Sequence, residues 1–352
     1  MSITLFDPVR LGALHLPNRI VMSPLTRCRA RLGIGLATPE MARYYAQRAS
    51  AGLIISEGIP VSPMAVGYAG VSGLWSEDQT ESWRTVVDGV HAAGGRIVAQ
   101  LWHVGRLSDP VFLGGDLPVA PSAIPPNGTV TLQRPKRPWT VPRALALEEI
   151  GRVVSEFAAA AHNARRAGFD GVEIHAANGY LIDQFLQSGS NHRTDEYGGS
   201  IPNRARLLFD IVDALIPVWG ADRIGVHLSP RDGHSMSDAD PASLFGHVAA
   251  QLGRRRLAFL FLREAVRPDG LAPAMRRAFG GPLIANEKLD CASAAALIAS
   301  GEADAVAFGQ LFIANPDLPA RLAGGLPLTE PDPATFYTHG PEGYTDYPSV
   351  RS

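Results

Sequence analysis

The chain has 352 residues, of which 46% are hydrophobic, and a formal net charge of −2. This length suffices for one large domain or two smaller ones, and the mixed charges give no sign of a nucleic-acid groove or a membrane-binding face. Its two cysteines, Cys28 and Cys291, lie too far apart in sequence to suggest a disulfide framework, which favours a reducing cytoplasm. No signal-peptide core or stretch of transmembrane length is present, so we expect a cytoplasmic protein.

Short apolar runs alternate with amphipathic helical segments along the whole chain. The runs are apolar throughout, which is typical of parallel strands covered on both faces. The predicted strands cover residues 20–24, 52–58, 96–105, 171–179, 223–230, 257–264, 282–286 and 304–310. The predicted helices cover residues 38–50, 76–94, 147–168, 200–220, 241–256, 271–280, 291–303 and 315–325. This alternation predicts an α/β fold, a single (β/α)₈ TIM barrel over residues 1–352. An open doubly wound sheet is the alternative, but no Gly-x-Gly-x-x-Gly follows the first strand.

A long proline-rich segment, residues 104–142, separates the third predicted strand from its helix. It is too long for an ordinary βα loop. We therefore expect an inserted capping segment, a lid or small subdomain over the barrel mouth.

The stretch from Gly168 to Phe185 holds the candidate catalytic residues of the chain. Its strand is followed by His175, Asn178 and Tyr180, at the end where α/β proteins usually place their sites. Two hydrogen-bond donors beside a phenolic proton suit the polarisation of a carbonyl and the protonation of a neighbouring carbon. The alternative is a packed strand end with satisfied polar groups.

The carboxyl ends of barrel strands face one shared mouth, which is where we expect the site. Polar or aromatic residues stand at these ends: Thr26, Glu57, Gly58, Gln100, Trp102, His103, His175, Asn178, Tyr180, His227, Arg263, Asn286, Glu287, Lys288, Gly309 and Gln310. We expect Arg263 to pair with a nearby acid, with a ligand phosphate or carboxylate as the alternative. No carboxylate–histidine spacing accompanies His175 and His227, so we predict no metal site.

The chain resembles the old yellow enzyme family of flavin-dependent ene-reductases over nearly its whole length. The resemblance rests on VMSPLTRCRA, ARYYAQRASAGLIISEG, HAAGGRIVAQLWHVGR, LPVAPSAI, GFDGVEIHAANGYLIDQFLQ, NHRTDEYGGSIPNRARLLFDIVDA, IANPDLPARL and GYTDYP. It implies a barrel with FMN across its mouth, NADPH or NADH as reductant, and hydride transfer to the β-carbon of an activated alkene.

The resemblance also implies roles for individual residues. His175 and Asn178 match the pair that holds the substrate carbonyl, and Tyr180 matches the proton donor. Cofactor contacts fall on Thr26, Gly58, Gln100, His227, Asn286, Gly309 and Gln310, and substrate contacts on Tyr68, Trp102 and Tyr337. Tyr337 could alternatively only pack the C-terminal tail.

Four departures from the family pattern fall on the flavin side. His227 stands where the family has an arginine, and Glu287-Lys288 replaces a glycine loop. Gln310 replaces the arginine that meets the phosphate, and Thr338-His339 replaces glycines. An arginine is always charged, whereas a histidine can be neutral at pH 7.

Three hypotheses follow for function. The first is an FMN-dependent reductase that acts on an α,β-unsaturated carbonyl compound. The second is a flavin-free isomerase or cyclase that uses Tyr180, His175 and Asn178 for carbonyl activation and proton transfer. The third is an inactive ligand-binding paralogue. In each case we expect a small-molecule ligand with a conjugated carbonyl, and a monomer or homodimer.

Overall fold

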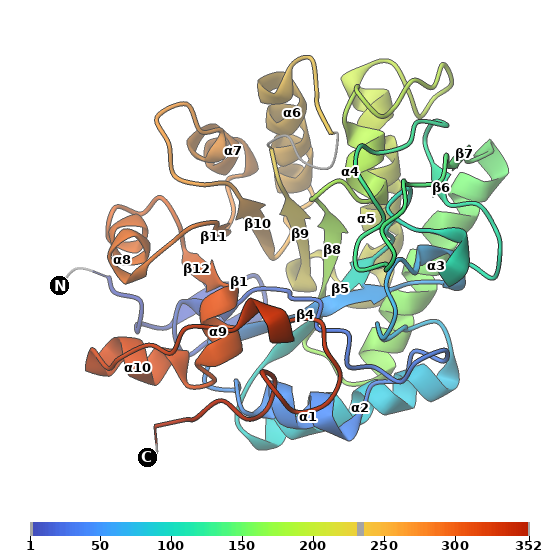
Figure 1. Cartoon of the computed structure of the whole chain (residues 1–352). Helices are drawn as coiled ribbons and strands as arrows, with labels where there is room; N and C mark the ends of the chain where they lie inside the picture. Colours follow the sequence, from blue (N-terminus) through green and yellow to red (C-terminus); the bar gives the residue numbers. More distant parts are fainter. Residues whose placement is uncertain (1–2, 231–235, 351–352) are drawn as a thin grey trace.

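Eight parallel strands close into a barrel in the computed structural model, which describes residues 3–230 and 236–350 (Figure 1). Around the barrel the strands are β3 (Ile20–Met22), β4 (Leu53–Pro60), β5 (Ile97–Trp102), β8 (Gly171–Ala176), β9 (Ile224–Leu228), β10 (Phe259–Arg263), β11 (Leu283–Asn286) and β12 (Ala305–Phe308). β12 pairs with β3 and so closes the ring. The predicted (β/α)₈ barrel is confirmed, and the open sheet is wrong because no strand of the barrel is left as an edge.

A ring of helices surrounds the barrel (Figure 1). They are α1 (Pro39–Ala46), α2 (Glu77–Ala92), α3 (Leu147–Arg166), α4 (Leu181–Leu186), α5 (Ile201–Trp219), α6 (Pro241–Arg254), α7 (Ala272–Phe279), α8 (Cys291–Ala299), α9 (Gln310–Ala314) and α10 (Leu318–Gly324). In α2, a capping box between Ser76 and Gln79 fixes the start, and Trp83, Val87 and Val90 bury one face. Within the described ranges, no helix combines the length and the apolar character that crossing a bilayer requires.

A two-stranded antiparallel hairpin, β1 (Val9–Leu11) and β2 (Leu14–Leu16), precedes the barrel. Its buried leucines join the apolar cluster inside the barrel, with Val21, Phe259 and Ala305. Gly12 in its turn has φ +58°, and a Cβ there would stand 2.3 Å from the Asp222 carbonyl oxygen. The hairpin therefore helps to close the barrel interior, and the sequence analysis missed it because its strands are short.

Residues 104–142 pack beside the site. The segment contains a short 3₁₀ helix (Pro110–Phe112) and β6 (Val119–Ala120), which pairs with β7 (Arg143–Ala144) just beyond it. Its buried Val104, Leu107, Val130 and Trp139 share one apolar cluster with Tyr68 and Trp102. A role as a lid stays a prediction.

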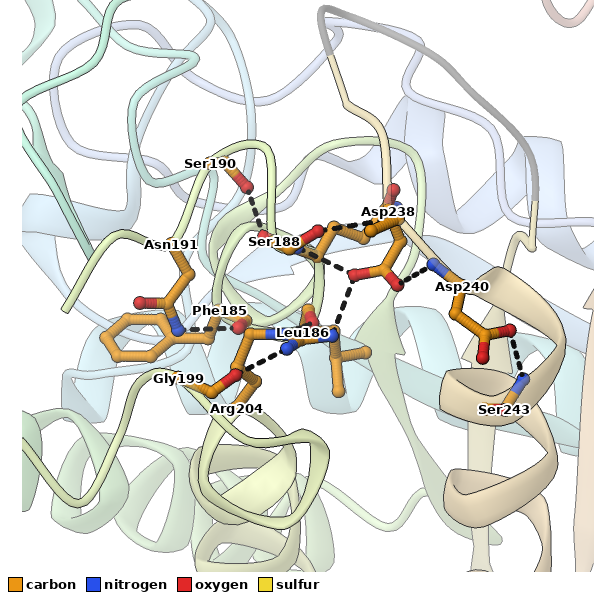
Figure 2. Close-up of polar contacts among 12 residues, drawn as sticks. Phe185, Leu186, Ser188, Ser190, Asn191, Gly199, Arg204, Asp238, Asp240 and Ser243 are labelled. Atoms are coloured by element: carbon orange, nitrogen blue, oxygen red, sulfur yellow. Dashed lines mark hydrogen bonds and ion pairs between the residues drawn. The ribbon is translucent and has the colours of Figure 1, made fainter. Parts of the chain in front are cut away.

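The segments that follow β8 and β9 are fastened together by a buried ion pair (Figure 2). Arg204 on α5 lies 2.8 Å from Asp238, which also accepts from the Ser188 backbone amide. The same guanidinium donates to the carbonyls of Leu186 and Gly199. This contact holds the end of α4, the helix for which Tyr180 is the N-cap.

Candidate functional site

A cavity of about 760 Å³ opens at the carboxyl ends of the barrel strands. This volume lies in the range of roughly 300–1,000 Å³ that is usual for ligand sites. The cavity is lined by the residues predicted as catalytic, cofactor or substrate contacts: Thr26, Gly58, Tyr68, Gln100, Trp102, His175, Asn178, Tyr180, His227, Asn286, Gly309, Gln310 and Tyr337. Glu57 and His103, also expected at the mouth, do not line it, because both side chains are buried behind the strand ends, where Glu57 pairs with Tyr45 and His103 accepts from the Gly105 amide. Arg27, Thr131, Phe261 and Glu330 also line it, and the sequence analysis did not single them out. The roles of these residues stay predictions.

Tyr180 lies among aromatic rings at one wall of the cavity. Its hydroxyl is 3.1 Å from that of Tyr68, and its ring stands edge-on to Trp102 at 4.8 Å and to His175 at 5.0 Å. Burial holds the pKa of the Tyr180 phenol well above its usual range. The phenol therefore keeps its proton at neutral pH and can give it up only to a strongly basic centre, such as a carbanion or enolate.

A column of buried polar side chains crosses the barrel below this wall. Strand register places Gln100 beside Glu173, and His175 beside His227. Gln100 Nε2 donates to Glu173 Oε2 at 2.6 Å and lies 3.3 Å from His227 Nδ1. The Gln100 amide directs one hydrogen to Glu173 and the other to His227. Because His227 Nδ1 accepts this hydrogen bond, the proton of the neutral His227 ring lies on Nε2. Glu173 could not be recognised as a site residue from the sequence, because it stands inside an apolar strand rather than at its end.

The two histidines of the column are neutral. Their rings stack at 5.0 Å, inclined by only 5°. Burial lowers the pKa of His175 to about 3, with Arg263 contributing, and holds the pKa of His227 well below its ordinary value. The site therefore presents a neutral donor at His227, where the family pattern has a fixed positive charge.

Glu173 is expected to make the protein less stable as the pH rises above neutrality. Burial raises its carboxyl pKa from 4.5 to about 8, so the folded chain binds a proton that the unfolded chain releases between these values. The free energy of unfolding falls with pH across that window. His175 opposes this only below its unfolded pKa of 6.5, so the decline is clearest between pH 6.5 and about 8.

Urea unfolding of Glu173→Gln at both ends of this range measures the effect. We expect the variant to lose less stability than the wild type as the pH rises. Glu81→Gln is the control, since that side chain is 65% exposed, and it should retain the wild-type decline. An unchanged decline in Glu173→Gln would contradict the assignment. Glu57 and Asp183, whose pKa values burial raises to about 7, are expected to supply the remaining decline.

The loop after β11 keeps a glycine-like backbone without glycines. Glu287 has φ +110° and Lys288 has φ +53°, both in the region that side chains disfavour. Such strain costs about 1–3 kcal/mol per residue, and strained residues of this kind cluster at active sites and ligand-binding loops. The Glu287 carboxylate lies 2.6 Å from Arg263 Nε. This pairing confirms the acid partner expected for Arg263 and compensates the charge of Glu287.

Lys288 brings a positive charge to this side of the cavity. It lines the same cavity as Gln310 and has no ion-pair partner among the residues that the structure describes. The two side chains offer an ammonium and a neutral amide in place of the arginine that the family pattern places at strand eight. An ammonium and an amide bind an anion less strongly than a bidentate guanidinium does.

The donor set fits FMN. His227 Nε2, a buried nitrogen in the cavity wall, has no partner within the described ranges. Gln100 adds an amide to the same wall, and Gly58 has no room for a side chain, since a Cβ would lie 2.7 Å from Trp102. These groups suit a flat polar ring, and Lys288 suits a phosphate.

The C-terminal tail forms the remaining wall. Arg27 donates to the carbonyls of Phe336 and Gly343, and Arg29 donates to those of Thr335, Phe336, Gly340 and Glu342. Tyr337 lines the cavity while remaining 46% exposed, so it does more than pack the tail. Thr338 bonds with Arg29 through its hydroxyl, and His339 is absent from the cavity lining.

The described residues contain no group of three or more histidine, cysteine or carboxylate side chains placed to hold a metal. The fold and the site define a (β/α)₈ barrel whose mouth is lined by His175, Asn178 and a tyrosine, Tyr180, that keeps its proton at neutral pH.

Comparison with known proteins gives the family. Residues 4–329 match the NADH:flavin oxidoreductase / NADH oxidase family. A probable flavin mononucleotide-dependent alkene reductase of Leishmania infantum is 43% identical over 98% of this chain and 97% of its own. The 12-oxophytodienoate reductase 1 of Oryza sativa subsp. japonica is 40% identical over 99% of this chain and 94% of its own.

Solved structures agree. The old yellow enzyme homologue from Zymomonas mobilis is 46% identical, with a TM-score of 0.96 over 99% of this chain and all of its own. Morphinone reductase in complex with tetrahydroNAD is also 46% identical, with a TM-score of 0.95 over 99% of this chain and 98% of its own. The chain belongs to the NADH:flavin oxidoreductase, or old yellow enzyme, family.

Proposed function

We propose that the protein reduces the C=C bond of an α,β-unsaturated carbonyl compound, with FMN as cofactor and NADPH or NADH as reductant. The single observation that carries the proposal is the convergence of His175, Asn178 and Tyr180 on one cavity. The alkene reductase, the 12-oxophytodienoate reductase and the morphinone reductase among the relatives support it.

The side chains divide the work. His175 and Asn178 would donate to the substrate carbonyl oxygen and draw charge from the alkene toward it. Tyr180, kept protonated by burial, would give its proton to the α-carbon. Trp102 and Tyr68 would hold the substrate against this wall. FMN, held by Gln100, His227 and Lys288, would supply the hydride when bound.

Reconstitution followed by turnover tests the proposal. Apo-protein titrated with FMN should acquire a flavin absorbance band that survives desalting. The loaded protein should then convert 2-cyclohexen-1-one to cyclohexanone with NADPH or NADH. Loading with FMN but no conversion of cyclohexenone or of larger enones would overturn the proposal.

A flavin-free isomerase or cyclase is the second candidate, favoured by the absence of an arginine at positions 227 and 310. A colourless protein that takes up no FMN at millimolar concentration is the result it requires. A cytoplasmic location and a monomeric or dimeric state belong to the same proposal and are tested by fractionation and light scattering.

Lys288→Gln is expected to weaken FMN binding roughly ten- to hundredfold, because a hydrogen bond to a charged group contributes about 1.5–3 kcal/mol. Riboflavin has no phosphate, so its affinity should not change. Fluorescence titration measures both. Lys136→Gln is the matched control, since Lys136 is exposed and is the only other lysine of the chain. An equal loss for riboflavin would show that Lys288 acts elsewhere.

A further inference from the structure

Arg263 joins two sides of the cavity mouth. It stands at the end of β10 and reaches Glu287 beyond β11 with Nε, at 2.6 Å. With Nη1 it reaches Asn178 Oδ1 beyond β8, at 2.8 Å. A carboxylate, a guanidinium and an amide thus form one chain across the mouth.

This chain fixes which end of the Asn178 amide faces the cavity. A guanidinium has donors only, so it can bond the amide oxygen but not the amide nitrogen. The flipped amide would place two donors against each other and lose the contact with Arg263. The bonded orientation leaves both Nδ2 hydrogens free to point away from Arg263.

The backbone of Asn178 is held as well. Its amide nitrogen donates to Ser229 Oγ at 2.8 Å, and its φ of +58° lies in the left-handed region. Because backbone and amide oxygen are both fixed, the remaining freedom of the side chain is small. A donor fixed before the ligand arrives costs less to order on binding.

Arg263 is itself kept in place by Glu287. The pair is partly shielded, with 36% of the Arg263 side chain and 13% of the Glu287 side chain exposed. The strained φ of +110° at Glu287 sets the course of the loop that carries this carboxylate. Glu287, which replaces a glycine of the family pattern, therefore holds Arg263 in place at the substrate side of the cavity.

We propose that Arg263, anchored by Glu287, is a positioning residue that orients the Asn178 amide so that its N–H faces the substrate carbonyl. The inference rests on the proposed function for the identity of the ligand, but not for the orientation of the amide. It assigns Glu287 to the substrate wall rather than to the phosphate.

A double-mutant cycle tests the coupling, with 2-cyclohexen-1-one as the probe. Arg263→Met should weaken its binding about five- to twentyfold, within the range of coupling between contacting residues. Asn178→Gly tolerates the positive φ and removes the amide. If Arg263 acts through Asn178, then Arg263→Met should add nothing in the Asn178→Gly background. Losses that multiply would overturn the proposal.

The control is Arg267→Met. Arg267 lies on the loop that follows β10, is 48% exposed, and contacts Glu264 and Asp269 rather than the cavity. It should leave the binding of cyclohexenone unchanged.

A second measurement needs no ligand or turnover. The side-chain NH₂ signals of Asn178 in a ¹⁵N spectrum of the full chain, identified by their loss in Asn178→Gly, should shift in Arg263→Met but not in Arg267→Met. Unmoved signals would overturn the inference whatever the protein reduces. Shifted signals in a protein that neither binds nor reduces enones would keep the inference and reject the proposed function.

Discussion

Tyr180→Phe is expected to slow enone reduction about 10²–10⁴-fold, the usual contribution of a positioned general acid. The variant keeps the ring that packs edge-on against Trp102 and loses only the hydroxyl. FMN binding and flavin reduction by NADPH should therefore be unchanged. Stopped-flow absorbance separates the two half-reactions, and only the reoxidation by cyclohexenone should slow.

Tyr197→Phe is the matched control for this substitution. Tyr197 also donates a hydrogen bond, to Asp210 at 2.9 Å, but it does not line the cavity. A fast oxidative half-reaction in Tyr180→Phe would show that the proton comes from another group. Tyr68, whose hydroxyl lies 3.1 Å away, would then be the first alternative.

Arg48→Met is expected to lower the free energy of unfolding by about 3–5 kcal/mol, because each buried acceptor that is left unsatisfied costs roughly 1–3 kcal/mol. Arg48 is fully buried and donates at 2.8 Å to each of the Tyr44, Phe312 and Ile313 carbonyls. Its guanidinium also lies 3.7 Å from the centre of the Tyr44 ring. Urea unfolding measures the loss.

The same substitution at Arg84 serves as comparison. That side chain is 44% exposed and forms a surface ion pair with Glu81, so its removal should cost well under about 1 kcal/mol. A loss below about 1 kcal/mol in Arg48→Met as well would mean that the carbonyls find other donors. Arg48 does not line the cavity, so refolded Arg48→Met should bind ligand as the wild type does.

Much of the fold could be predicted from the sequence because parallel barrel strands are apolar throughout and their helices have one apolar face. Seven of the eight predicted strands contain a strand of the closed barrel, and the eighth, 52–58, ends two residues before β4 does. The hairpin β1–β2 and the short helices α4 and α9 contain too few residues for a hydrophobic periodicity to be recognised in the sequence. Their positions depend on tertiary contacts, such as those of Leu11 with the barrel interior.

The residues that line the site could be predicted from the sequence, but the contacts between their side chains could not. Strand ends converge in a barrel, and so the residues at those ends could be collected without coordinates. Which of them touch could not be inferred. The Arg263–Asn178 bond passes over the end of β9, and Gln100 meets Glu173 through strand register. The first contact depends on the reach of the Arg263 side chain past β9, and the second on the register between the neighbouring strands β5 and β8.

The wall built from the C-terminal tail bears on how the chain is made. Arg27 bonds Gly343 across 316 positions of sequence, and Arg48 bonds Phe312 across 264. Closing loops of this size is slow compared with local folding. During translation Arg48 lacks its Phe312 partner, and Arg27 its Gly343 partner, until those residues have left the ribosome. The ligand cavity therefore lacks the wall formed by Phe336 and Tyr337 until those residues have been synthesised.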